Sequence, residues 1–333
     1  MRWLKRIGIG ILALLVAAVL GGSTYEMWAR HRIAAEFAPP GKLVDIGGRR
    51  IHLDCRGTGA PIVVFESGLD MYGSLSWSAV QDQVAQTTRA CSYDRAGIMW
   101  SDRAPGARNG AAIASDLHAA LQAAGERGPY VMVGHSLGGP YVMTFARQFG
   151  DVVAGIVFVD ASHPDQQQRM QEAIGQQAQP SMAGPKLAAA LAWMGVPRLF
   201  TGSVGHAQAP ARANAAMSAY LPRSLQPMLD EQAAIDETFS AAGALRSLGE
   251  RPLVVLTAAA PLQAADLAAL KLTSEQGQRL QAVWLKLHDE ETSWSSRGRQ
   301  VRLDDSHHYI QFERPDAVID AVRAVVNDIR GQS

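Results

Sequence analysis

Apolar residues along the chain alternate between two spacings, one typical of buried strands and one typical of helices. Several short runs are continuously apolar, as expected of strands that are covered on both faces. Between these runs, apolar residues recur at the spacing of helices with one buried face. We therefore expect an α/β fold with a mostly parallel central sheet and helices on both faces. The continuous runs lie at 61–65, 130–133, 153–159 and 252–257.

Weaker patterns add further elements to this sheet. Two glycines at 47 and 48 separate strand-like segments at 42–46 and 49–55, which predicts a hairpin. The remaining expectations are a helix near 77–86, a strand around Cys91, helices over 113–121 and 141–149, a strand at 300–303 and a closing amphipathic helix over 313–329.

The segment 164–249 interrupts this alternation, because it is rich in Gln, Ala and Met and shows no convincing strand. An insertion at this point would lie over the carboxyl ends of the strands, where α/β sheets bind ligands. We expect a helical cap insertion over 164–249 on a core formed by 41–163 and 250–330. A disordered Gln-rich linker is the alternative, and the aromatic residues of the segment argue against it. Helical spacing is found at 166–174, 186–193 and 225–239.

The first residues of the chain form a separate segment, which we place at 1–30. Three basic residues within the first six precede a run at 7–20 without charged or polar side chains. A membrane-spanning helix needs about 20 apolar residues, and the run reaches this length if it extends to residue 25. No good cleavage site follows, which favours an uncleaved anchor through residues 7–25 over a signal peptide. We expect the protein to be exported and either anchored in the inner membrane or periplasmic or secreted; a buried N-terminal helix is the alternative.

Charge and cysteine content limit the possible partners. Lys plus Arg and Asp plus Glu are equal at 31 each, so no net field favours nucleic acid, and no nucleic-acid partner is expected. The two cysteines, Cys55 and Cys91, both lie in strand-like runs. An oxidising compartment would permit a disulfide between them, and two buried thiols are the alternative.

The most informative motif is Gly134-His135-Ser136-Leu137-Gly138, which directly follows the strand at 130–133. A strand that ends in Gly-x-Ser-x-Gly and turns at once into a helix is a nucleophile elbow. Serine at the apex of such a turn has strained backbone angles, and the glycines avoid collisions with the strand and helix. The helix that follows directs its free N–H groups at the same place. Ser136 is therefore our candidate nucleophile, and an incidental serine in a Gly-rich turn is the alternative.

From about residue 41 to 329 the chain resembles the α/β-hydrolase fold family, close to its cap-bearing serine esterase-like branch. The resemblance implies the fold strongly, because order and spacing agree over nearly the whole chain after the N-terminal segment. It does not identify a substrate, since this fold carries many chemistries. The matching motifs are FESGL at 65–69, YDRAG at 93–97, GHSLG at 134–138, VDASH at 159–163 and HYIQFERP at 308–315.

The resemblance also indicates the base that would activate Ser136. His308 follows the last strand and stands three residues before Gln311, as in the family pattern. The family usually has glycine just before this histidine, whereas this chain has His307, which leaves His307 as an alternative base. His135, inside the elbow, is expected to pack beside the turn and the substrate pocket.

Two aspartates are candidates for the acid that would orient the base. Many family members carry the acid after the strand at 252–257, but here three alanines and a proline follow, and the first carboxylate is Asp266. Asp160, at the end of the preceding strand, occupies an alternative acid position known in this fold family. We favour Asp160 over Asp266. The competing interpretation of Asp160 is a strand-end residue that caps local backbone.

An acyl-transfer site also needs hydrogen-bond donors for the oxyanion. The resemblance places these donors at the backbone amides of Leu69 and Leu137. The family motif Gly-x-Gly-x-Ser corresponds here to 97–101, with Met99 in place of a glycine, so we expect Met99 and Trp100 to line the pocket. Asp94 and Arg95 are interpreted as a structural turn.

Two classes of function agree with these patterns. The first is a serine hydrolase that cleaves small-molecule esters with an apolar portion through an acyl-enzyme, with amidase or lactonase activity on the same triad as variants. The second is a non-catalytic, membrane-tethered binding protein of the same fold. The sequence shows no metal-ligand spacing and no phosphate-binding glycine loop, so no cofactor and no metal are expected.

Overall fold

The structure is a computed structural model that describes residues 2–175 and 181–331. Within these residues, eight strands form one sheet in the order β1-β2-β4-β3-β5-β6-β7-β8. Strand β2 is antiparallel to both β1 and β4, and the other neighbours are parallel, which confirms the predicted fold class. The strands are β1 (Lys42–Asp45), β2 (Arg50–Arg56), β3 (Ile62–Glu66), β4 (Ala90–Tyr93), β5 (Tyr130–His135), β6 (Val153–Val159), β7 (Leu253–Ala258) and β8 (Gly298–Leu303).

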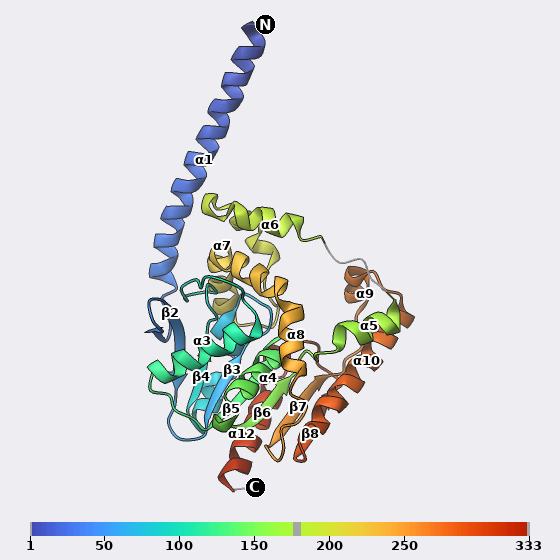
Figure 1. Cartoon of the computed structure of the whole chain (residues 1–333). Coiled ribbons are helices and arrows are strands. Elements are labelled where there is room, and N and C mark those ends of the chain that lie inside the picture. The colour runs from blue at the N-terminus through green and yellow to red at the C-terminus, as the bar shows by residue number, and fades with distance from the viewer. Residues whose placement is uncertain (1, 176–180, 332–333) are drawn as a thin grey trace.

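Helices cover both faces of the sheet (Figure 1). One face packs against α3, α4 and α8, and the other against α2 and α12. Side chains of successive strand residues point to opposite faces of the sheet. Val64 and Met132 pack in the core on the side of α3, α4 and α8, and Val63 and Val131 pack in the core on the side of α2 and α12. This explains the continuous apolar runs. The helices are α1 (Arg2–Glu36), α2 (Gln81–Ala85), α3 (Gly110–Ala123), α4 (Gly138–Gln148), α5 (Gln166–Ile174), α6 (Ala183–Ala190), α7 (Ala211–Ala233), α8 (Ile235–Gly243), α9 (Ala264–Leu270), α10 (Ser274–Ser293), α11 (Ile310–Glu313) and α12 (Pro315–Arg330), with 3₁₀ helices η1 (Gly73–Trp77), η2 (Gly150–Val152), η3 (Ala192–Met194) and η4 (Val196–Ser203).

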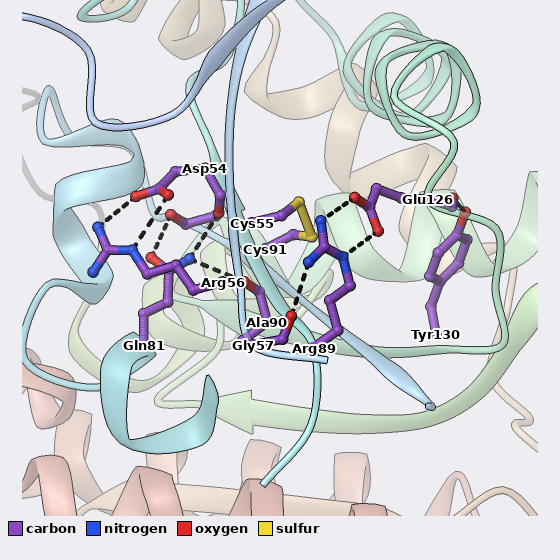
Figure 2. Close-up of a disulfide and its surroundings, with 11 residues drawn as sticks. Asp54, Cys55, Arg56, Gly57, Gln81, Arg89, Ala90, Cys91, Glu126 and Tyr130 are labelled. Carbon is purple, nitrogen blue, oxygen red and sulfur yellow. Dashed lines mark hydrogen bonds and ion pairs between the residues drawn. A yellow bond between two sulfur atoms is a disulfide. The ribbon is translucent and has the colours of Figure 1, made fainter. Parts of the chain in front are cut away.

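A disulfide joins the antiparallel strands β2 and β4. Cys55 and Cys91 lie directly opposite each other in the strand register, and their sulfur atoms are 2.06 Å apart. Figure 2 shows the bond beside an ion pair between Arg89 and Glu126, which links the start of β4 to the loop before β5. Of the two alternatives for the cysteines, the structure therefore contains the disulfide.

The chain between β6 and β7 is helical, as its composition predicts, although residues 176–180 of the expected cap lie outside the described residues. Helix α5 has the predicted bounds, whereas the predicted helix over 225–239 is divided at Ala234 between α7 and α8. Helix α8 packs against α3 and α4 over the sheet, and α5 packs against α10. The division into core and cap at residues 164 and 249 stays a prediction.

Two helices between β7 and β8, α9 and α10, were not expected from the apolar spacing. Helix α10 contacts β7, β8 and α5, so it connects the edge of the sheet with the segment that follows β6. Its start carries a local signal: the side chain of Thr273 accepts a hydrogen bond from the Gln276 amide, and the Gln276 side chain accepts one from the Thr273 amide. This reciprocal capping box is visible in the sequence as Thr-x-x-Gln.

The N-terminal segment is a continuous helix, α1, that extends away from the body (Figure 1). It is long and apolar enough to cross a membrane, with a mean hydropathy of 2.2 over its most apolar 18 residues, none of which is buried in the protein. The alternative of a buried core helix therefore does not hold. Only the last turns of α1 contact the body, where Glu26 is buried and forms an ion pair with Arg198.

Candidate active site

Ser136 stands at the turn between β5 and α4 with a φ of +52°, in the left-handed region that is unfavourable for residues with a side chain. The flanking glycines are required by close approaches. A Cβ atom on Gly134 would lie 2.6 Å from the Gly138 carbonyl oxygen, and one on Gly138 would lie 2.5 Å from that of Glu66. The turn therefore has the geometry of a nucleophile elbow and presents the serine hydroxyl beyond the end of the sheet.

The structure brings Ser136, His308 and Asp160 together from three loops at the carboxyl ends of the strands. His308, between β8 and α11, places Nε2 2.9 Å from Ser136 Oγ. Its Nδ1 lies 2.7 Å from Oδ2 of Asp160, the residue that follows β6. Because the carboxylate accepts the Nδ1 proton, Nε2 is left free to accept the proton of the serine hydroxyl.

Asp160 is held by groups other than His308 as well. Its Oδ1 accepts hydrogen bonds from the Ala258 amide and from Trp284 Nε1, both at 2.9 Å. Burial opposes the ionised form, but the hydrogen bond and the attraction of His308, together with His288 and Trp284, outweigh it and hold the pKa of this carboxyl below its usual value. Asp160 therefore stays a carboxylate that points at the imidazole.

The alternative acid and the alternative base lie near these groups but make other contacts. Asp266 accepts a hydrogen bond from the Gln263 amide at 3.0 Å and caps helix α9. The His307 ring lies 3.4 Å from Glu313 and 3.3 Å from the Gln263 side chain. Within the described residues, neither Asp266 nor His307 is hydrogen-bonded to His308 or Ser136.

His135 lies buried beneath the turn and supports His308. Its Nε2 is 2.9 Å from the carbonyl oxygen of His308, so this nitrogen carries the proton and donates it. Burial, and then repulsion by the His308 imidazole, lowers the pKa of His135 to about 3. A neutral ring in contact with the His308 backbone has a positioning role rather than that of a base.

The two amides that the family resemblance selects as oxyanion donors are free of protein acceptors. Neither the Leu69 nor the Leu137 amide forms a hydrogen bond to another group within residues 2–175 and 181–331. A Cβ atom on Gly68 would lie 2.9 Å from Ser136 Cβ, so the loop that carries Leu69 adjoins the serine. Both amides are thus available for an oxygen beside Ser136.

Met99 and Trp100 were expected in the substrate pocket, but the structure places them elsewhere. Both are buried in a cluster with Tyr220 of helix α7. The Trp100 indole donates to the carbonyl oxygen of Phe37, at the end of α1. The family motif marks this loop in the sequence, but the direction in which the loop turns is set by its packing against α7 and Phe37.

Arg95, interpreted as part of a structural turn, is the centre of a buried ionic network. Its guanidinium donates to Glu66 at 2.8 Å, to Glu231 of α7 at 2.9 Å and to the Gly68 carbonyl oxygen at 2.7 Å. Burial raises the pKa of Glu66 to about 7 against the attraction of Arg95. Because Glu231 is 136 residues away in the sequence, no local pattern predicts it. The network fixes the loop beside Ser136 and ties it to α7.

Replacing Arg95 by methionine is expected to lower the free energy of unfolding by about 3–5 kcal/mol, because the buried Glu66 and Glu231 lose their cation. The matched control is Arg302→Met, whose pair with Asp289 is about half exposed and is expected to contribute about 0–1 kcal/mol. Urea unfolding of the full chain in mild detergent, followed by circular dichroism, measures both. Equal losses in the two variants would contradict the role of the network.

A cavity of about 450 Å³ adjoins Asp160 and His308. Trp284 and Leu280 of α10, Leu270 of α9 and Met170 of α5 form much of its wall, so most of its surface is apolar. Ser136 is not part of this wall, which places the cavity on the His308 side of the serine. Asp266 and His307 contribute to the lining, so both lie beside the cavity rather than in the hydrogen-bonded chain.

Among residues 2–175 and 181–331, two clusters have the residue types of a metal site, but their side chains are bound to other partners. His163, Asp165 and Glu290 lie close together, yet Arg246 is 2.8 Å from Asp165 and Arg169 is 2.7 Å from Glu290. The second cluster consists of Cys55, Cys91 and Glu126, in which the sulfurs are bonded to each other and the carboxylate is paired with Arg89 (Figure 2). Guanidinium groups and a disulfide make both poor cation sites.

Comparison with known proteins agrees with this architecture. A sequence model of the alpha/beta hydrolase fold matches residues 60–196. The structure of an esterase from Thermogutta terrifontis is similar with a TM-score of 0.61 and 18% identity, covering 86% of this chain and 98% of that one. The structure of an epoxide hydrolase from Bacillus megaterium is similar with a TM-score of 0.56 and 14% identity, and the match covers 86% of this chain and 100% of the epoxide hydrolase chain. The "Probable transporter efuK" of Hormonema carpetanum is 35% identical over 129 residues; these are 36% of this chain and 18% of that protein, so the chain spans under a fifth of its length.

Proposed function

This chain has the α/β-hydrolase fold, and we propose that within it the protein is a serine hydrolase that cleaves carboxylic esters through an acyl-enzyme. The fold and its esterase and hydrolase neighbours support a hydrolytic function. The observation that carries the serine mechanism is the hydrogen-bonded chain from Ser136 through His308 to Asp160, at 2.9 and 2.7 Å.

In the proposed reaction, Ser136 Oγ attacks the ester carbonyl carbon while His308 Nε2 takes the hydroxyl proton. The amides of Leu69 and Leu137 donate to the oxygen that becomes negative. Collapse of the intermediate breaks the bond to the alcohol, which leaves with the proton from His308. A water molecule then attacks the acyl-enzyme while His308 takes one of its protons. Collapse of this second intermediate breaks the bond to Ser136 Oγ, which regains its proton from His308, and the acid is released. Asp160 holds the imidazole in the required tautomer and stabilises its charged form throughout.

The nucleophile separates this proposal from epoxide hydrolysis. Opening of an epoxide on this fold normally uses a carboxylate nucleophile, whereas the turn here carries the hydroxyl of Ser136. A serine alkoxide suits attack on a carbonyl carbon. Amides and lactones are carbonyl substrates for the same groups and remain the alternatives within this mechanism, and a non-catalytic binding protein is the alternative outside it.

The apolar cavity supports a substrate with an apolar acyl or aryl portion. Trp284, Leu280 and Leu270 offer hydrophobic surface beside His308, and burial of a hydrocarbon chain there is favourable by about 25 cal/mol per Å². We therefore propose a small-molecule ester whose apolar part occupies the cavity.

We also propose that α1 anchors the protein in a membrane through residues 7–25 and that the remainder is exported. The exposed apolar surface of α1 supports the anchor. The Cys55–Cys91 disulfide supports an oxidising compartment for the body, because disulfides are rare in a reducing cytosol. The basic N-terminus would then lie on the cytoplasmic side.

Labelling with a fluorophosphonate and hydrolysis of p-nitrophenyl esters of increasing acyl length test the proposal on the full chain in mild detergent. We expect covalent label on Ser136 and a rate that rises from acetate to medium-length acyl chains. A profile that peaks on short, charged substrates would overturn the assignment of the cavity. Absence of both label and hydrolysis would favour the binding protein.

A further inference from the structure

Large apolar side chains are exposed on α6, η3 and η4, three elements that contact one another, and η3 also contacts α1. We call these residues the apolar ridge: Leu187 of α6, Trp193 of η3, and Leu199 and Phe200 of η4. Their exposed fractions are 62%, 52%, 80% and 54%. Large apolar side chains clustered at such exposure indicate an interaction surface rather than scattered surface residues.

The ridge lies at the height where the apolar part of α1 ends. A Cβ atom on Gly22 would be 2.8 Å from the carbonyl oxygen of Met194, and one on Gly195 would be 3.7 Å from the Tyr25 ring. Residues 7–25 of a helix span about 28 Å, close to the hydrocarbon thickness of about 30 Å. The chain that carries the ridge is therefore level with the point where α1 would leave the bilayer.

The residues at this height change from apolar to aromatic and charged, as at a membrane surface. Tyr25 and Trp28 of α1 are 52% and 55% exposed, and Trp193 of the ridge lines the same hollow as Glu26 of α1. Such aromatic residues are enriched where hydrocarbon meets the headgroups. The first carboxylate of α1, Glu26, is turned inwards and paired with Arg198 and Arg30.

We propose that the apolar ridge is a membrane-docking surface, inserted into the outer boundary of the same bilayer that α1 crosses. The inference rests on the proposed anchoring by α1 and goes beyond it, because an anchor alone leaves the body free to tilt. Contacts of α1 with η3 hold the ridge against the membrane. Figure 1 shows α6, α7 and α9 on the side of the body from which α1 leaves. Since α9 lines the cavity, the docked orientation turns that side towards the lipid and favours esters that partition into membranes.

The depth of single spin labels tests the docking. The two natural cysteines are joined, so Leu199→Cys and Phe200→Cys each give one free thiol for a nitroxide. The full chain is reconstituted into vesicles of phosphatidylcholine and phosphatidylglycerol, and collisions with lipid-soluble oxygen and a water-soluble nickel chelate are compared. Leu14→Cys on α1 is the reference for the bilayer, and Val301→Cys on β8 is the matched apolar control, because these side chains are 73% and 40% exposed. A circular dichroism spectrum that matches the spectrum of the wild type shows that each variant is folded.

We expect the labels at positions 14, 199 and 200 to collide mainly with oxygen and the label at position 301 to collide mainly with the nickel chelate. If the label at position 14 collides mainly with oxygen and the labels at 199 and 200 collide mainly with the nickel chelate, the proposed docking is wrong and the proposed anchor is retained. If the label at position 14 collides mainly with the nickel chelate, both the anchor and the docking of the apolar ridge are wrong. Low access of both reagents at 199 and 200, together with spin–spin coupling between labels, would show that a second copy of the chain covers the ridge and would also overturn the proposal. None of these results depends on catalysis, so a failure of the hydrolase assignment is seen separately.

Discussion

Replacement of Ser136 by alanine is expected to lower kcat/KM for ester hydrolysis by about 10⁶-fold. The reason is the loss of the only oxygen positioned both for attack and for proton transfer to His308, at 2.9 Å, among the described residues. The residual rate would come from the Leu69 and Leu137 amides and from substrate binding. His308→Ala is expected to have an effect of similar size, because these two groups act as one unit.

The control for this loss is Ser162→Ala, a buried serine close to the same turn. Its amide donates to the Ser136 carbonyl oxygen, but its hydroxyl forms no hydrogen bond to His308 within the described part of the chain. We expect this variant to retain nearly the full rate. A Ser136→Ala protein as active as Ser162→Ala would show that the reaction does not pass through Ser136.

Replacement of Asp160 by asparagine is expected to reduce kcat by about 10⁴-fold with little change in folding. An amide at this position can donate to His308 Nδ1, which stabilises the tautomer that carries its proton on Nε2. That tautomer cannot accept the serine proton. Steady-state kinetics with the ester on which the wild type is fastest measures the loss.

Asp266→Asn is the matched control, since it changes the other candidate acid in the same way. Asp266 caps α9 and lines the cavity, so we expect a change in KM of at most severalfold and an unchanged kcat. A large fall in kcat for Asp266→Asn with normal Asp160→Asn kinetics would reverse the assignment of the acid.

The reaction that this fold can carry out in the protein depends on individual side chains at the site, above all on Ser136. The fold is shared with an esterase and with an epoxide hydrolase at under 20% identity, so similarity of architecture does not select a reaction. The hydroxyl of Ser136, rather than a carboxylate, favours carbonyl substrates. The residues around it then decide how the hydroxyl is activated and which acyl groups fit.

Much of the architecture is determined by local sequence. Continuous apolar runs follow from strands with two covered faces, and Gly134 and Gly138 follow from backbone contacts within a few residues of Ser136. Helix α5 begins and ends where its apolar spacing predicts. The apolar run of α1 is likewise a property of consecutive residues. Features of this kind can be predicted because the residues that cause them are close together in the sequence.

The tertiary structure decided the features whose partners are distant in sequence. Asp160 rather than Asp266 meets His308 because β6 ends beside the loop after β8, across 148 residues. Met99 and Trp100 turn away from Ser136 towards Tyr220. Arg95 finds Glu231 only because α7 crosses the loop beside Ser136. Side-chain contacts of this range depend on how complete elements pack against one another, and the free energy of that packing is not encoded in the spacing of neighbouring residues.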